Sequence, residues 1–476
     1  MQEIIISVGI DIGTSTTQLI FSRITIENLA SSYTVPRISI VNKEVIYRSE
    51  IYFTPLKSLT EIDANEIERI VKQEYKNAGI TPEMLKTGAV IITGETARKK
   101  NADEVLKKLS NLAGDFVVAT AGPDLESVLS AKGAGSDKLS KEEKLTVANL
   151  DIGGGTTNIA VFKKGIIAAT SCLDIGGRLI KIEDGKISYI YPKIKELAQS
   201  NQIHIEVGEK AEVDKLEQIC TLMAEQLSMA INRSTRTNQH AGIYTNEGKP
   251  LPEELEIQGL TFSGGVADYV YHPADDDWFR YGDIGVLLGK AILKNDGIKK
   301  VQQFQAVETI RATVVGAGTH TTEVSGSTIT YERERLPIKN MPVLKIPEEE
   351  EMDLEAVTAS LIKQIPLFYT EGKLEQLVIA LSGNFHTSFA SVQELAEAIL
   401  KGSQEIVKSE FPIVIAVEND IGKVLGNAIK VMLECRKDVV CIDGIHAGSG
   451  DYLDIGEPIA NGRVVPVVTK TLIFNS

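Results

Sequence analysis

The amino-acid sequence predicts an α/β protein in which two related halves are followed by a third α/β module. An apolar strand runs into an acid, a glycine and several hydroxyl side chains at residues 10–17, and the same order returns at residues 149–158. A third apolar strand ends on paired glycines within residues 260–267. Elsewhere strands and helices alternate along most of the chain, which is the pattern of an α/β fold.

Residues 149–158 have the composition of a hairpin that binds phosphate. Apolar strands flank the stretch, and its glycines allow backbone angles and a close approach that a Cβ atom would prevent. Main-chain N–H groups in such a turn can form an anion-binding concavity, hydroxyls add donors, and a carboxylate can hold hydrated Mg²⁺ against phosphate oxygens. Taken alone, the motif is equally compatible with an ordinary glycine-rich hairpin. The residues concerned are Asp151, Gly153, Gly154, Gly155, Thr156 and Thr157.

The copy at residues 10–17 carries Asp11 in the position that Asp151 has in the later motif. At residues 260–267, the missing side chains would let adenine and ribose lie against the backbone. In their order along the chain, the three motifs resemble the first phosphate loop, the second phosphate loop and the adenosine loop of the actin, Hsp70 and sugar-kinase superfamily. The further nucleotide-binding residues expected from it are Gly13, Thr14, Ser15, Thr16, Ser263, Gly264 and Gly265.

This resemblance implies duplicated ribonuclease-H-like halves, which are actin-like ATPase domains, flanking a nucleotide cleft, with an additional C-terminal α/β module. We expect the first half at residues 1–143, the second half with the adenosine loop at 144–340, and the C-terminal module at 341–476. The implied cofactors are ATP and Mg²⁺, with Asp11 and Asp151 as the metal ligands.

The segment at residues 121–133 connects the two halves and has an apolar helical face. In the superfamily, an acidic or amide residue at the start of the corresponding helix positions the attacking water. Asp124 is our choice for that position and Glu126 is the alternative, so the expected catalytic residues are Asp124, Asp11 and Asp151. The two helix acids are equally explained by the preference of a helix dipole for negative charge in its first turn.

Local patterns predict further elements. Asn65 precedes an apolar helical face that ends at Gly79, which predicts a helix capped by Asn65. Residues 310–315 have the pattern of a strand, and Gly176 and Gly177 that of a turn. The proline-containing segment that ends in four glutamates at residues 348–351 predicts a linker or an extended crossover.

Length and charge exclude several classes of function. At roughly 150 residues per domain, a chain of 476 residues has room for about three domains. The net charge of −15 opposes nonspecific binding, so we expect no nucleic acid partner. No apolar run approaches the roughly 20 residues that span a bilayer, and the first residues lack the basic start of a signal peptide. We therefore expect a cytoplasmic protein with no membrane partner.

Residue spacing excludes other sites. The four cysteines include no Cys-x-x-Cys pair, and the six histidines show no His-Glu-x-x-His spacing, so neither zinc nor a disulfide framework is indicated. No Gly-x-x-x-x-Gly-Lys-Ser/Thr motif occurs, which excludes a P-loop ATPase. The glycine-rich loops described above are therefore the expected nucleotide site.

Longer strings resemble a narrower family. Residues 93–98 (TGETAR), 316–327 (GAGTHTTEVSGS) and 454–468 (DIGEPIANGRVVPVV) are similar to the EutA family of ethanolamine ammonia-lyase reactivating factors. That resemblance implies a chaperone of the bacterial cytoplasm, or of a bacterial microcompartment, with ethanolamine ammonia-lyase as its partner. Such a factor uses ATP and Mg²⁺ to release damaged cobalamin, so that intact adenosylcobalamin can replace it. The absence of an Asp-x-His-x-x-Gly cobalamin motif fits a factor that acts on the holoenzyme.

The sequence leaves two other functions open. One is a small-molecule kinase of the same fold, acting on a sugar or an acid, in which ATP turnover needs an added acceptor. The other is a nucleotide-dependent scaffold without a client enzyme, which sedimentation with ATP would reveal. A homo-oligomer is compatible with each of these functions, and either ATP binding or ATP hydrolysis could drive release.

Overall fold

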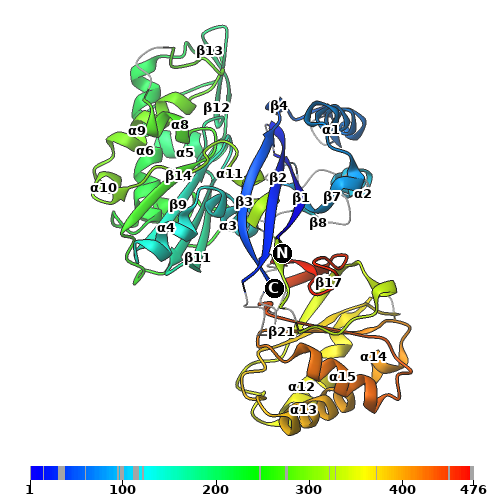
Figure 1. Ribbon diagram of the computed structural model, residues 1–476. Coiled ribbons are helices and arrows are strands. Elements are labelled where there is room, and N and C mark those ends of the chain that lie inside the picture. Colours follow the sequence, from blue (N-terminus) through cyan, green and yellow to red (C-terminus); the bar gives the residue numbers. More distant parts are fainter. Residues whose placement is uncertain are drawn as a thin grey trace.

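The computed structural model describes residues 2–13, 16–29, 38–58, 61–93, 96, 101–110, 117–120, 123–245, 248–273, 277–320, 322–326, 328–370, 373–448 and 451–471. Thr14 and Ser15 of the first loop lie outside these ranges. The chain forms three lobes, which Figure 1 shows as a first half in blue, a second half in cyan and green, and a C-terminal module in yellow to red.

The first half is a mixed sheet with helices on one face. Its strands are β1 (Gln2–Ile12), β2 (Thr16–Asn28), β3 (Ile38–Arg48), β4 (Tyr52–Phe53), β7 (Leu85–Ile92) and β8 (Val117–Thr120), and the helices are α1 (Ala64–Ala78) and α2 (Ala102–Ser110). The order is β3-β2-β1-β7-β8, with β4 beside β2. Strands β1 to β3 pair antiparallel, whereas β7 and β8 continue parallel to β1. Both helices bury apolar side chains against the same face of this sheet. The short elements β5 (Leu56–Ser58), β6 (Glu61–Ile62) and η1 (Pro82–Met84) connect them.

The second half repeats this topology. Its strands are β9 (Thr146–Ile152), β10 (Thr157–Lys163), β11 (Ile166–Leu173), β14 (Gly259–Ser263) and β15 (Gln302–Gln303), beside a hairpin of β12 (Ile180–Glu183) and β13 (Lys186–Ile190). The sheet order β11-β10-β9-β14-β15 has three antiparallel strands followed by two parallel ones, as in the first half. The duplicated fold is therefore confirmed. The helices are α5 (Pro192–Ser200), α6 (Val213–Ala230), α7 (Asn238–Ala241), α8 (Ala267–Tyr271), α9 (Gly285–Lys294) and α10 (Asp296–Lys299).

Two crossing segments join the halves and pack against each other. One contains α3 (Pro123–Gly133) and α4 (Ser136–Glu142), and the other contains α11 (Ala312–Val315) and the π-helical turn η3 (Gly316–His320). Leu129 of α3 packs with Ala317 of η3 against the first sheet, while Ala131 packs against the second sheet. The crossing segments therefore form a layer between the two sheets.

The prediction of a strand at residues 310–315 was wrong, because this segment contains the helix α11. Its β-branched residues favour a strand, but packing against α3 decides the conformation. A Cβ at Gly133 would overlap the carbonyl of Ala312, and a Cβ at Gly316 would overlap the carbonyl of Leu129. Glycines at the crossing thus let the two helical backbones touch.

The N-cap of helix α1 lies two residues before the predicted cap, Asn65. The carboxylate of Asp63 accepts hydrogen bonds from the backbone N–H groups of Asn65 (3.1 Å) and Glu66 (3.2 Å), so Asp63 is the N-cap. The end of the helix was predicted correctly, since Gly79 adopts the left-handed conformation with a φ of 67°.

The C-terminal module is a mixed sheet covered by helices on one face. Its strands are β16 (Thr322–Val324), β17 (Ile338–Lys345), β20 (Val378–Leu381), β21 (Ile413–Val417), β22 (Val439–Asp443), β23 (Asp451–Ile455) and β24 (Pro466–Thr471), in the order β16-β24-β23-β17-β20-β21-β22. The helices are α12 (Leu354–Gln364), α13 (Phe389–Gly402), α14 (Gln404–Lys408) and α15 (Gly422–Met432), with the short elements η4 (Arg333–Arg335), η5 (Ile365–Phe368), β18 (Tyr369–Thr370) and β19 (Lys373–Leu374). Apolar clusters lie on both faces of the sheet.

This sheet includes residues that the expected boundary at 341 assigned to the second half. Strand β16 and the start of β17 pair with β24 and β23 from the end of the chain. The module also packs on the first half, because Ile459 and Val464 join a cluster with Ile5 and Ile24 of its sheet. The structural unit therefore begins at β16.

The glutamates at residues 348–351 form no linker, but lie in the crossover that leads from β17 through α12 to the parallel strand β20. Glu351 is fully buried, and its carboxylate accepts hydrogen bonds from Ser382 N (2.5 Å), Ser382 Oγ (2.8 Å) and Gly383 N (2.8 Å). These three donors replace the water that a carboxylate otherwise needs. The glutamate therefore fixes the turn that follows β20.

The close crossing of α3 and α11 predicts a large cost for Gly133→Ala. The added Cβ must push the Ala312 carbonyl away, so we expect the free energy of unfolding to fall by about 1–3 kcal/mol. Chemical denaturation would measure the loss. Gly242→Ala is the matched control, since a Cβ there lies 3.5 Å from its nearest neighbour. Equal effects of both substitutions would contradict the crossing contact.

Candidate functional site

Two aspartates occupy equivalent places in the two halves. Asp11 lies near the end of β1 and Asp151 near the end of β9, one residue before each strand stops. Asp11 is 8% exposed and accepts a hydrogen bond from Thr93 Oγ1 (3.1 Å), while Asp151 is 6% exposed and accepts one from Ser263 Oγ (2.6 Å). Each carboxylate is thus held by a hydroxyl from the neighbouring parallel strand or the residue directly after it.

The carboxylates of Asp11 and Asp151 repel each other across the two halves. Burial raises the pKa of Asp11 to about 7; the hydrogen bond from Thr93 opposes this rise, and the charge of Asp151 adds to it. Burial raises the pKa of Asp151 to about 6, against the opposing hydrogen bond from Ser263. Two buried acids whose charges interact form a site suited to a positive charge.

The oxygen ligands here fit Mg²⁺. This ion prefers carboxylates and water, and it is usually bound through one or two carboxylates together with the phosphates of a substrate. Over the described parts of the chain, no group of three or more His, Cys, Asp or Glu side chains could hold a metal ion. The Asp11 and Asp151 pair therefore matches a metal that arrives with a phosphate ligand, rather than a cage made by protein alone.

The two predicted phosphate loops are closed by equivalent backbone hydrogen bonds. Gly13 N donates to Thr16 O and Gly153 N donates to Thr156 O, each at 2.9 Å. The carbonyl of Gly13 also accepts hydrogen bonds from Thr54 Oγ1 (2.7 Å) and from Thr96 Oγ1 (3.1 Å). Residues 153–156 are partly exposed, and a Cβ at Gly155 would meet no atom within 4 Å. The tip of the second loop is therefore open to a ligand.

Some of the expected nucleotide ligands have structural partners instead. Thr157 is buried, and its hydroxyl donates to Ile175 O (2.8 Å). Ser263 is buried between Asp151 and Asn149, whose amide donates to its hydroxyl at 2.8 Å. These side chains support the loop and the acid and do not point at an open surface.

The paired glycines after β14 differ from each other. Gly264 has a φ of +83°, and a Cβ there would overlap the backbone of Ile152 at the start of the second loop. Gly265 is exposed, and a Cβ there would meet no atom within 4 Å. Gly264 is therefore required by the fold, whereas Gly265 presents bare backbone to a ligand.

Gly176 and Gly177 form part of this site, although the sequence pattern suggested only a turn. Gly177 N donates to Gly153 O (3.0 Å) and Arg178 N donates to Gly154 O (2.6 Å), so this segment holds the second loop from behind. A Cβ at Gly176 would lie 2.5 Å from Gly154 O. A signal was present, because the order Asp-Ile-Gly at residues 174–176 repeats that of both phosphate loops.

Asp124 lies in the first turn of α3, near the same edge of the first sheet as Asp11 and Thr93. Its carboxylate accepts a hydrogen bond from Thr170 of β11. Burial raises the pKa of the Cys172 thiol, and the charges of Glu126, Asp174 and Asp124 contribute to that rise. Among the contacts of the described residues, none joins Asp124 to Asp11, to Asp151 or to the loops.

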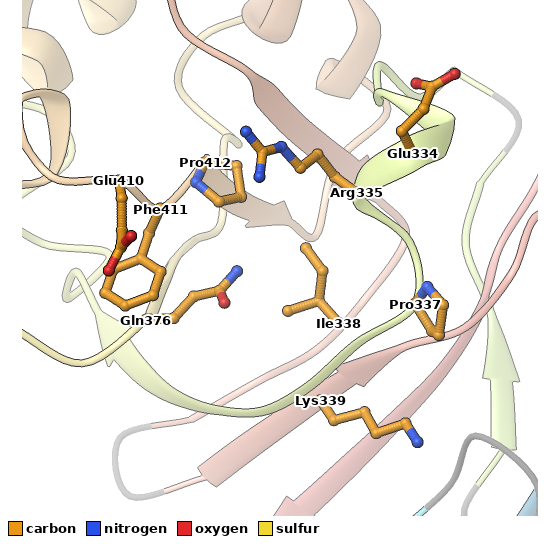
Figure 2. Close-up of a pocket in the computed structure, with 9 residues that line it drawn as sticks. All are labelled: Glu334, Arg335, Pro337, Ile338, Lys339, Gln376, Glu410, Phe411 and Pro412. Atoms are coloured by element: carbon orange, nitrogen blue, oxygen red, sulfur yellow. The ribbon is translucent and has the colours of Figure 1, made fainter.

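A separate cavity of about 510 Å³ opens in the C-terminal module. Figure 2 shows Arg335, Gln376 and Pro412 gathered around it, at the end of the sheet where β17 and β21 begin. Arg335 is held by Asp438 at 2.6 Å. None of the residues expected at the nucleotide site lines this cavity.

The chain is similar to known proteins over nearly its full length. The model of the family described as ethanolamine utilisation protein EutA matches residues 3–475. Ethanolamine ammonia-lyase reactivase EutA of Escherichia coli (strain K12) is 36% identical over 481 residues, covering 99% of this chain and 99% of that protein. The reactivase EutA of Salmonella typhimurium is 35% identical over 478 residues, with the same coverage.

A solved structure from the Ppx/GppA protein family of Aquifex aeolicus matches more distantly, with 15% identity and a TM-score of 0.40 over 66% of this chain and 97% of that chain. Within the described ranges, no helix has both the length and the apolar character needed to cross a membrane. The match to the family model and the full-length relatives show that this chain belongs to the ethanolamine utilisation protein EutA family.

Proposed function

We propose that this chain is an ATP- and Mg²⁺-dependent reactivating factor for adenosylcobalamin-dependent ethanolamine ammonia-lyase. In this role it releases damaged cobalamin from the lyase, so that intact cofactor can bind. The observation that carries the nucleotide part is the pair of buried, mutually repelling carboxylates, Asp11 and Asp151, each beside a glycine loop. The client is supported by the full-length relatives, which are ethanolamine ammonia-lyase reactivases.

Different residues of the site bind different parts of the Mg²⁺-ATP complex. Asp11 and Asp151 would hold Mg²⁺, which when bound neutralises charge on the phosphate oxygens. The N–H groups around Gly154 and Gly155 donate to phosphate, and the bare backbone at Gly265 lies against adenosine. Asp124 orients the attacking water once its carboxylate leaves Thr170.

Release of cobalamin requires two states with different affinity for the lyase. The halves are joined by the α3 and α11 crossing, so a nucleotide that bridges both loops favours a closed arrangement. ATP, with one more phosphate than ADP, stabilises that arrangement more strongly. The change in angle between the halves then changes the affinity for the client lyase.

The direct test is recovery of inactivated enzyme. Ethanolamine ammonia-lyase inactivated with cyanocobalamin is mixed with the full chain, ATP, Mg²⁺ and free adenosylcobalamin, and ethanolamine turnover is followed. We expect activity to return only when all components are present. ATP hydrolysis that requires an added sugar or acid, with no recovery of the lyase, would identify a kinase instead.

Asp151→Asn should abolish function while making the nucleotide-free protein more stable. Loss of the metal-facing charge should lower ATP turnover by about a hundredfold or more. The native state holds this acid in its neutral form up to a pKa of about 6, so the carboxylate costs stability as the pH rises from about 4 to about 6. The asparagine variant should therefore gain up to about 3 kcal/mol in free energy of unfolding at pH 7.5, and less at pH 4.5.

Chemical denaturation at the two pH values would measure this gain. Glu183→Gln is the control, since that acid is exposed and should change neither turnover nor stability. A destabilised Asp151→Asn variant at pH 7.5 would show that the acid has a structural role.

Gly265→Val should lower ATP affinity by about ten- to a hundredfold, because its side chain would enter the open space where adenosine binds. The fold should be unchanged, which thermal unfolding can verify. Calorimetric titration would give the affinity, with Gly242→Val as a control outside the site. Undiminished binding would mean that adenosine lies elsewhere.

Asp124→Ala should keep nucleotide affinity near that of the natural chain but slow hydrolysis, since a residue that orients only the nucleophile acts in the transition state. The expected loss is roughly ten- to ten-thousandfold in single-turnover assays. Glu126→Ala is the matched comparison one helical half-turn away. A loss with Glu126→Ala alone would assign the role to Glu126.

A further inference from the structure

Phe53 is an exposed aromatic residue on a firmly held strand. Its ring is in the first half and the residue is 77% exposed, yet both of its neighbours are fixed. Tyr52 Oη donates to the buried carboxylate of Glu74 (2.7 Å), and Thr54 Oγ1 donates to the carbonyl of Gly13 (2.7 Å). The Phe53 ring therefore extends from the residue next to Thr54, whose hydroxyl supports the first phosphate loop.

Arg178 has the corresponding place in the second half. Its backbone N–H donates to Gly154 O (2.6 Å), which ties it to the second phosphate loop. Its side chain donates from Nε to Asp283 Oδ2 (3.3 Å), and Asp283 itself accepts from Gly285 N (2.9 Å) at the start of α9. The hydrogen bond to Asp283 thus fixes the guanidinium to the second half, and the same side chain reaches the first half.

The two side chains meet between the halves. The guanidinium carbon of Arg178 lies 5.8 Å from the centroid of the Phe53 ring, within the range of a cation–π interaction. The pair therefore connects a segment that supports the first phosphate loop to a segment that supports the second. Both residues are far in sequence from the crossing of α3 and α11. Closing the halves around a ligand would keep this contact, and separating them would break it.

We propose that Arg178 and Phe53 form a latch that holds the two halves together over bound nucleotide and slows its release. Arg178 is then a positioning residue for the ATP site, acting through the Phe53 ring. This inference rests on the proposed nucleotide site. It goes beyond that proposal in assigning nucleotide residence time to a contact that does not touch the nucleotide.

Dissociation of a fluorescent N-methylanthraniloyl ATP from the full chain, with Mg²⁺ present, tests the latch. Phe53→Ala leaves Tyr52 and Thr54 in place, and Arg178→Ala keeps the backbone bond to Gly154. Each variant should release the nucleotide about two- to thirtyfold faster, the change that loss of a cation–π contact supports. The double variant should be no more than about twofold faster than the faster single variant, because both remove the same contact.

Arg280→Ala is the matched control, since Arg280 lies at the same distance, 5.8 Å, over Tyr269 within one half. Its release rate should stay within about twofold of the natural chain. Unchanged rates in the single variants, or effects that multiply in the double variant, would overturn the latch.

Hydrogen exchange in the nucleotide-free protein separates this inference from the proposed function. If the natural chain binds no nucleotide, the proposed function fails and the role of the latch in nucleotide release fails with it, while exchange still tests the contact between Arg178 and Phe53. Arg178→Ala should increase amide exchange in β4 and leave exchange in α1 unchanged. Equal exchange in β4 with and without the arginine would refute the contact.

Discussion

The arrangement of the two duplicated halves depends on the contact of bare backbones where α3 crosses α11 and η3. Gly133 and Gly316 remove the side chains that would separate these segments, and Gly9 and Gly318 do the same where η3 meets β1. Backbones that touch can rotate on each other but cannot separate without opening a void. This crossing holds together the two sheets that carry Asp11 and Asp151.

The electrostatics of the site follow from that geometry. Hydrogen bonds from the hydroxyls of Thr93 and Ser263 offset the cost of burying Asp11 and Asp151 only in part, so burial raises both pKa values, and the charge of Asp151 adds to the rise at Asp11. Such an arrangement lowers the stability of the protein without its ligands, which is common where function sets the side chains. In the proposed function, a cation bound together with phosphate would remove this repulsion, so ligand affinity and closure of the halves would be linked.

Much of the fold was predictable because its signals are local. Glycine loops between apolar strands marked both halves, and Gly79 marked the end of α1. The misassigned elements depend on distant partners. The β-branched residues of α11 become helical only because α3 lies against them, and Glu351 is buried only because the backbone at residues 382 and 383 supplies its donors. No pattern within a single segment carries that information.

The packing of the C-terminal module decides which body can move. Ile459 and Val464 are embedded among the isoleucines of β1 and β2, and Ala460 N donates to the carboxylate of Glu3 (2.5 Å). The module and the first half thus form one body, joined over the short connection from η3 to β16. In the proposed function, rotation about the crossing would displace the second half against this combined frame. A client that binds both the frame and the second half would be distorted by each nucleotide cycle. A client that binds the frame alone would move with it and would not be strained.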